Sequence, residues 1–102
     1  MQISTRNTDH QATLALQGRF DFHTHRDFRT AYEQPLDDSK IKEIVIDLGG
    51  VEYLDSSALG MLLLLRERAE SLGKTVSLAK MQGTVKQVLD VANFDKIFPM
   101  KA

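Results

Sequence analysis

Three β-branched residues, Ile44–Ile46, precede a long leucine-rich segment, and this pairing leaves few folds open. A β-branched run without polar alternation is typical of a central strand whose two faces are both covered. Gly49 and Gly50 then predict a loop. Ser57–Ser71 has the pattern of the longest helix, and Gly73 is suited to the position just past its end. The arrangement predicts an α/β fold with a crossover helix.

The other segments alternate between strand and helix patterns. Strands are expected at Gln2–Arg6, Thr13–Gln17, Thr75–Leu78 and Lys96–Phe98, and helices at Thr24–Gln34 and Thr84–Ala92. The first two strands form a predicted hairpin, and Gly18 is expected to end the second. Thr24 and Asp27 predict a cap for the first helix, and Pro35 its end. The order β-β-α-β-α-β-α-β predicts a mixed β-sheet with helices packed mainly on one face.

The composition of the chain excludes or disfavours several classes of function. The 102 residues suit one domain, which we expect to span residues 1–102, and a net charge of −1 disfavours nonspecific nucleic-acid binding and a polybasic membrane mode. The absence of cysteine excludes disulfides, thiolate catalysis and cysteine-based metal sites. Met1–Asp9 is polar, and the longest uninterrupted apolar run is Met61–Leu65, too short to cross a bilayer. We therefore expect a cytoplasmic protein without a cofactor.

The start of the leucine-rich helix carries the most informative chemistry. Asp55, Ser56 and Ser57 are all competent helix N-caps, because their side-chain oxygens can accept hydrogen bonds from first-turn amides. One cap leaves at least one hydroxyl at the helix N-terminus without a structural assignment. A phosphate there would meet free amides and the positive end of the helix dipole. A purely structural cap and a phosphorylated serine are both open interpretations of these residues.

The stretch Asp55–Gly60, read as Asp-Ser-Ser-Ala-Leu-Gly, resembles the signature of the STAS-domain family of bacterial anti-sigma factor antagonists. Gly18–Thr24 is similar to the family's Gly-x-Leu-Asp segment, and Val85–Leu89 with Phe94 and Ile97 follows its downstream pattern. The resemblance covers nearly the whole chain and agrees with the expected order of strands and helices.

This resemblance implies a protein-binding switch rather than an enzyme. It implies that a serine-kinase anti-sigma factor phosphorylates Ser56, that the unphosphorylated form binds this partner, and that a cognate serine phosphatase restores it. Asp21 matches the family's acidic residue beside the phosphosite, where Asp55 and Ser57 complete the environment. Ala58 stands where the family often has glycine. Because the sequence ends at Ala102, the family's C-terminal helix is expected to be shortened or absent.

The partner surface is expected around His23, Met61 and Leu64. The leucine-rich helix is apolar nearly all round, so its side chains either lie in the core or include a second, exposed apolar contact. The functional interpretation exposes Met61 or Leu64 to a partner, and the alternative is burial alone.

Two other functions compete with the switch. Asp21, His23, His25 and Ser56 include the residue types of a catalytic triad, but the Gly-x-Ser-x-Gly elbow is missing, and histidines two apart do not form a paired metal site. We therefore expect neither catalysis nor a metal. The second alternative is a constitutive, non-phosphorylated STAS subunit of a larger complex such as a lipid transporter.

Overall fold

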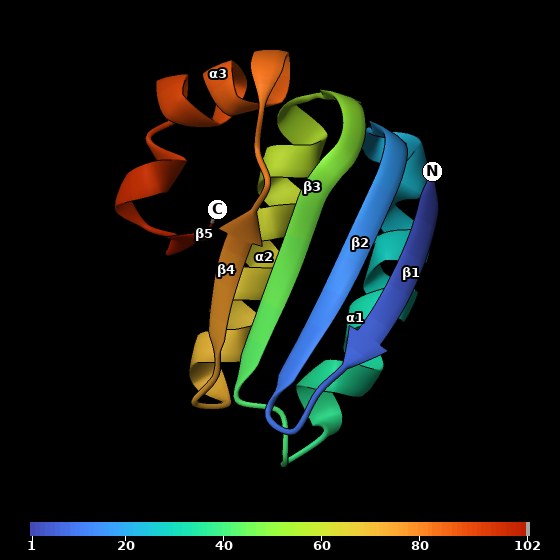
Figure 1. Cartoon of the computed structure of the whole chain (residues 1–102), viewed down its shortest axis with the longest axis vertical. Coiled ribbons are helices and arrows are strands. Elements are labelled where there is room, and N and C mark those ends of the chain that lie inside the picture. Colours follow the sequence, from blue (N-terminus) through green and yellow to red (C-terminus); the bar gives the residue numbers. More distant parts are fainter. Residues whose placement is uncertain (102) are drawn as a thin grey trace.

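A computed structural model describes residues 1–101, which form one five-stranded sheet in the order β1-β2-β3-β4-β5 (Figure 1). Strands β1 and β2 pair antiparallel, and all other neighbours pair parallel. The strands are β1 (Gln2–Asn7), β2 (Gln11–Phe20), β3 (Glu43–Leu54), β4 (Thr75–Ala79) and β5 (Met100–Lys101). The helices are η1 (Phe22–Thr24), α1 (His25–Asp37), α2 (Ser56–Ser71), α3 (Gly83–Val91) and η2 (Phe94–Lys96). The expected mixed α/β fold is confirmed.

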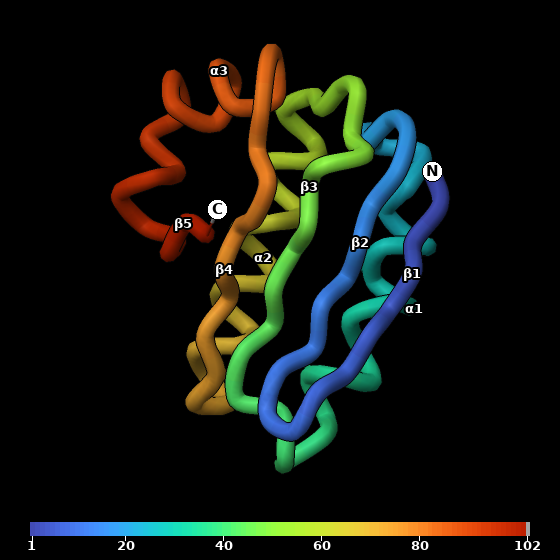
Figure 2. The backbone as a smooth tube through the Cα atoms, in the orientation of Figure 1, coloured from blue at the N-terminus to red at the C-terminus, as the bar shows by residue number. Residues whose placement is uncertain are grey.

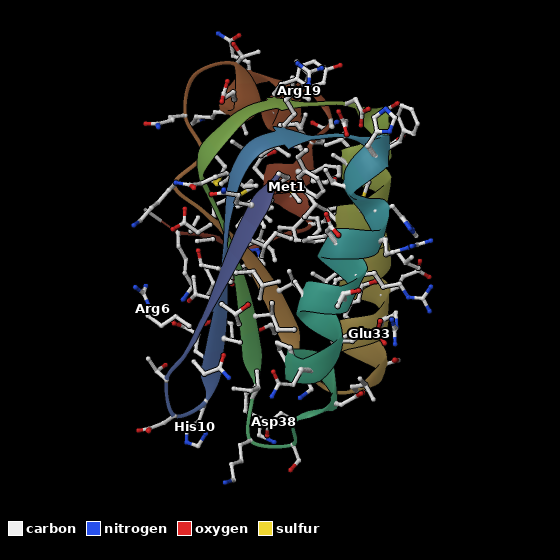
Figure 3. All side chains as sticks on the ribbon, turned by 90° about the vertical axis from the view of Figure 1, so that its right-hand side faces the viewer. Met1, Arg6, His10, Arg19, Glu33 and Asp38 are labelled. Carbon is white, nitrogen blue, oxygen red and sulfur yellow. The ribbon has the colours of Figure 1, made fainter. Side chains whose placement is uncertain are left out.

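Helices α1 and α2 cover the same face of the sheet, and α3 lies beyond one end of β4 (Figures 1 and 3). Figure 2 follows the chain from β1 at one edge of the sheet to β5 at the other. The core fills the space between the sheet and the two covering helices. Its fully buried side chains include Leu14, Ile46, Phe28, Leu62 and Leu65.

The two glycines expected to form a loop lie inside β3, so that prediction is wrong. A Cβ on Gly50 would lie 2.7 Å from Cγ of Gln17 and 2.9 Å from the carbonyl oxygen of Leu16. The pairing of β2 with β3 shifts register between Ala15 and Gln17 and again between Gly18 and Arg19. Glycine therefore serves a close approach between two strands here, and Gly18, with φ +98°, lies within β2 rather than ending it.

Helix α1 also runs past the residue expected to end it. Pro35 is buried within the helix, which continues to Asp37. The ammonium of the buried Lys74 donates hydrogen bonds to the carbonyl oxygens of Pro35 (3.4 Å), Asp38 (2.5 Å) and Ile41 (2.7 Å). A positive charge at a helix C-terminus satisfies carbonyls that have no partner within the helix. A tertiary contact is thus placed at the end of α1, two residues beyond the proline that was expected to end it.

The segment expected as a closing strand at Lys96–Phe98 instead begins inside a helical turn, η2, so that prediction is wrong. Asn93 takes a left-handed backbone conformation (φ 62°) after α3, and η2 begins at the next residue. Phe94 and Phe98 are buried with ring centroids 5.2 Å apart, and the amide of Phe98 donates to the carbonyl of Phe94. Their spacing of four residues is helical, which explains why the strand begins later, at Met100.

Candidate functional site

The parallel strands β2 and β3 end side by side, and the next residue of each is an aspartate. Phe20 pairs with Leu54 at the last position of the ladder, and the amide of Asp55 donates to the carbonyl oxygen of Phe20 at 3.3 Å. Asp21 and Asp55 therefore leave the sheet at the same edge. A helix begins after each aspartate, so two helix N-termini lie at this edge of the sheet (Figure 1).

Asp55 is the N-cap of α2. Its backbone is extended, and its carboxylate accepts a hydrogen bond of 2.9 Å from the amide of Ala58. Ser56 and Ser57 are the first two residues of the helix, and both are exposed. Within residues 1–101, no side-chain hydrogen bond involves either serine hydroxyl. The structural cap is therefore provided by the aspartate, and both hydroxyls are accessible.

Asp21 performs the same task at the preceding helical turn. Its carboxylate accepts a hydrogen bond of 3.0 Å from the amide of His23 and lies 3.6 Å from Nε of Arg19. Thr24, the expected cap, is buried and donates its hydroxyl to the carbonyl oxygen of Asp21 at 2.7 Å. The carboxylate of Asp21, at the same edge of the sheet as Ser56, is thus paired with an arginine and hydrogen-bonded to a backbone amide.

Of the three residues expected to contact a partner, two are exposed and one is buried. His23 is exposed, and its ring lies against that of Phe22, with centroids 3.9 Å apart and the ring planes tilted by 35°. The side chain of Leu64 is 43% exposed. Met61 is only 6% exposed and belongs to the core, so its assignment to the partner surface is wrong. Met61 lies on the buried side of α2, as most large apolar side chains of a covering helix do.

An apolar groove between α2 and α3 was missed by the sequence analysis. It has a volume of about 330 Å³ and is lined by Leu59, Gln87, Val88, Val91 and Ala92. Val91 is 85% exposed. One helix face carries three of these residues, Val88, Val91 and Ala92. This spacing is the sequence signal that could have indicated the groove. The groove adjoins the helical turn that begins with Ser56, because Leu59 is three residues further along α2.

In the part of the chain from residue 1 to 101, no hydrogen bond joins a serine at the start of α2 to His23 or His25. No group of three histidine, aspartate or glutamate residues in that range is placed to hold a metal ion. None of its helices is both long enough and apolar enough to cross a membrane.

The family model described as "Mlab, STAS domain" matches residues 3–100, so the chain belongs to the STAS family. A STAS-domain containing protein of Pseudomonas aeruginosa (strain UCBPP-PA14) is 46% identical over 88 residues, which cover 86% of this chain and 85% of that protein. An anti-sigma F factor antagonist of Paenibacillus polymyxa is 24% identical over 102 residues, and the match covers 98% of this chain and 87% of that protein. The resemblance found in the sequence is confirmed.

Solved structures share the fold. A putative anti-sigma factor antagonist from Thermotoga maritima has a TM-score of 0.87 at 21% identity, over 98% of this chain and 86% of that one. The anti-sigma factor antagonist SpoIIAA in its unphosphorylated form has a TM-score of 0.74 at 17% identity, over 99% and 87%. SpoIIAA in its phosphorylated form has a TM-score of 0.76 at 18% identity, over 99% and 91%.

Proposed function

We propose that this protein is an anti-sigma factor antagonist whose unphosphorylated form binds a serine-kinase anti-sigma factor and is switched off by phosphorylation of Ser56. The observation that carries the proposal is the exposed Ser56 hydroxyl in the first turn of α2, free because Asp55 caps the helix. The relatives named as anti-sigma factor antagonists support the choice of partner class. Such a switch would operate in the cytoplasm, and a serine phosphatase would reverse it.

The chemistry required of the partner is phosphoryl transfer from ATP. The bond between the γ-phosphorus and its bridging oxygen breaks, a bond forms from Oγ of Ser56 to that phosphorus, and ADP leaves. The hydroxyl proton passes to a base of the kinase. Our protein supplies only the acceptor, so we expect it to have no catalytic activity of its own.

Charge explains how the modification would stop binding without moving the fold. A phosphoserine adds a charge of about −1.5 to −2 together with acceptor oxygens. The added charge would lie at a helix N-terminus that tolerates an anion, next to Asp55 and near Asp21. A docked partner would have to desolvate this charge or pair it. A penalty of about 2.7 kcal/mol is enough to weaken binding roughly a hundredfold.

The partner surface that we propose follows the exposed side of α2 from Ser56. Leu63 is 38% exposed and lies seven residues from Ser56, which is two helical turns along the same side. Leu64 is beside it, and the apolar groove against α3 flanks the first turn. A partner seated there would bury apolar side chains around Ser56, the setting in which a new charge costs most.

The alternative, a constitutive STAS subunit of a larger complex such as a lipid transporter, would use the same fold without the phosphate. The two functions differ in the covalent state of Ser56. The test is the intact mass of the chain purified from its native cells, with the modified residue mapped by fragmentation. We expect a species about 80 Da heavier with phosphate on Ser56, present in the Ser57→Ala variant and missing from Ser56→Ala. An unmodified chain under all growth conditions would favour the constitutive subunit.

A further inference from the structure

The edge of the sheet that carries Ser56 also exposes aromatic side chains that the core does not use. The chain has five phenylalanines and two tyrosines. Five of these seven rings are buried, whereas Phe22 is 62% and Tyr53 is 41% exposed. Both exposed rings belong to the segments where β2 and β3 end. This concentration of exposed aromatic surface at one end is what a docking site offers, because aromatic residues are enriched in interfaces.

Each exposed ring is held by a neighbour. The ring of Phe22 lies against that of His23 in a tilted arrangement, with centroids 3.9 Å apart. The guanidinium carbon of Arg19 lies 4.2 Å from the centroid of the Tyr53 ring, and Arg19 is itself held by Asp21. We call Arg19, Phe22, His23 and Tyr53 the aromatic platform. Rings fixed in this way lose little conformational entropy when a partner binds, which favours affinity.

The platform adjoins Ser56 through the backbone. Arg19 pairs with Tyr53 across β2 and β3, and the amide of Asp55 bonds to the carbonyl of Phe20. Tyr53 is three residues before Ser56, and Phe22 directly follows Asp21. Figure 3 places Arg19 at the end of the molecule where β2 leads into α1. Any enzyme that brings ATP to the Ser56 hydroxyl must cover part of this end.

We infer that the aromatic platform anchors the kinase that phosphorylates Ser56, an inference that rests on the proposed function. The occupant is a protein surface with an apolar pocket for the rings of Phe22 and Tyr53. Tyrosine and arginine are among the residues that most often carry binding energy at protein interfaces. Arg19 acts as a positioning residue, because it fixes the Tyr53 ring while its own charge is paired with Asp21.

The test compares the initial rate of Ser56 phosphorylation among variants. Purified wild type, Phe22→Ala, Tyr53→Ala and Leu72→Ala are incubated with labelled ATP in a soluble extract of the native organism. Leu72 is the matched control, since it is 53% exposed and follows the far end of α2. Thermal unfolding checks that each variant is folded. We expect Phe22→Ala and Tyr53→Ala to slow phosphorylation by about tenfold or more, and Leu72→Ala to stay within about twofold of wild type.

The outcomes separate the inference from the proposed function. If the platform variants are phosphorylated as fast as wild type while Ser56→Ala accepts no phosphate, the platform is not the anchor and the proposed function stands. If wild type accepts no phosphate on Ser56, both fail. A dimer of wild type that Phe22→Ala dissociates in sedimentation, with unchanged phosphorylation, would assign the platform to self-association instead.

Discussion

The carboxylate of Asp55 accepts a hydrogen bond of 2.9 Å from the backbone amide of Ala58, and this contact makes the aspartate rather than a serine the cap of α2. Ser56 then occupies the first position inside the helix with its side chain exposed. Asp55 therefore stabilises the start of the helix, and the hydroxyl of Ser56 stays accessible.

Removal of this cap should destabilise the fold without a change in the core. We expect Asp55→Ala to lower the free energy of unfolding by about 1 kcal/mol, because a first-turn amide loses its acceptor. Asp55→Asn retains a capping oxygen and should lose much less. Urea unfolding of both variants measures the difference. Equal stabilities for Asp55→Ala and wild type would show that the cap contributes nothing.

Two glycines form a matched pair for testing the close approach of β2 and β3. Gly50→Ala should lose about 1–3 kcal/mol, because its Cβ would lie 2.7 Å from Gln17 and 2.9 Å from the Leu16 carbonyl oxygen. At Gly60, inside α2, an added Cβ would have no atom within 4 Å apart from the neighbouring backbone of its own helix. Gly60→Ala should therefore be neutral or up to about 1 kcal/mol more stable. Urea unfolding measures both variants. A Gly50→Ala protein with the same free energy of unfolding as wild type would contradict the packing described for β3.

Glu43 predicts an acid-sensitive step in stability. Burial acts to raise the pKa of its carboxyl group, but hydrogen bonds from Ser77, Gln11 and Lys101, with the charge of Lys101, lower the pKa below its ordinary value of 4.5. Such a group stabilises the folded state above the unfolded-state pKa, and this stabilisation is lost as the pH falls through the lowered folded-state pKa.

The Glu43→Gln variant isolates that contribution. Between pH 6 and pH 3, the free energy of unfolding of wild type should fall further than that of Glu43→Gln, because the variant has no carboxyl group to protonate at this position. Urea titrations at several pH values provide the comparison. Parallel pH profiles for the two proteins would mean that the pKa of Glu43 is the same in the folded and unfolded states.

The sequence was sufficient for the fold class because its strongest patterns are local. Ile44–Ile46 and the leucine-rich segment predicted β3 and α2, and the helix expected from Ser57 begins one residue earlier, at Ser56. The predictions from glycine and proline were wrong at positions where contacts between distant segments matter more than local preference. Gly50 serves a close strand approach, and Pro35 is accommodated within a helix whose end Lys74 satisfies.

The site was predicted less completely than the fold. A helix that is apolar all round does not reveal which side faces solvent, so Met61 and Leu64 could not be told apart without the sheet beneath them. The groove between α2 and α3 depends on how two helices far apart in sequence are placed. Asp21 was suggested by family resemblance and Asp55 was one of three candidate caps, whereas the geometry shows that both aspartates cap a helical turn.

The measurement that tests the switch most directly is the affinity of the proposed partner, a purified serine-kinase anti-sigma factor, for two variants of this protein. Isothermal titration in the absence of ATP compares Ser56→Ala, which keeps the site uncharged, with Ser56→Asp, which adds a permanent charge. We predict that Ser56→Ala binds like wild type and that Ser56→Asp binds about a hundredfold more weakly, a difference of about 2.7 kcal/mol. Equal affinities for the two variants would contradict the proposal that charge at Ser56 controls docking.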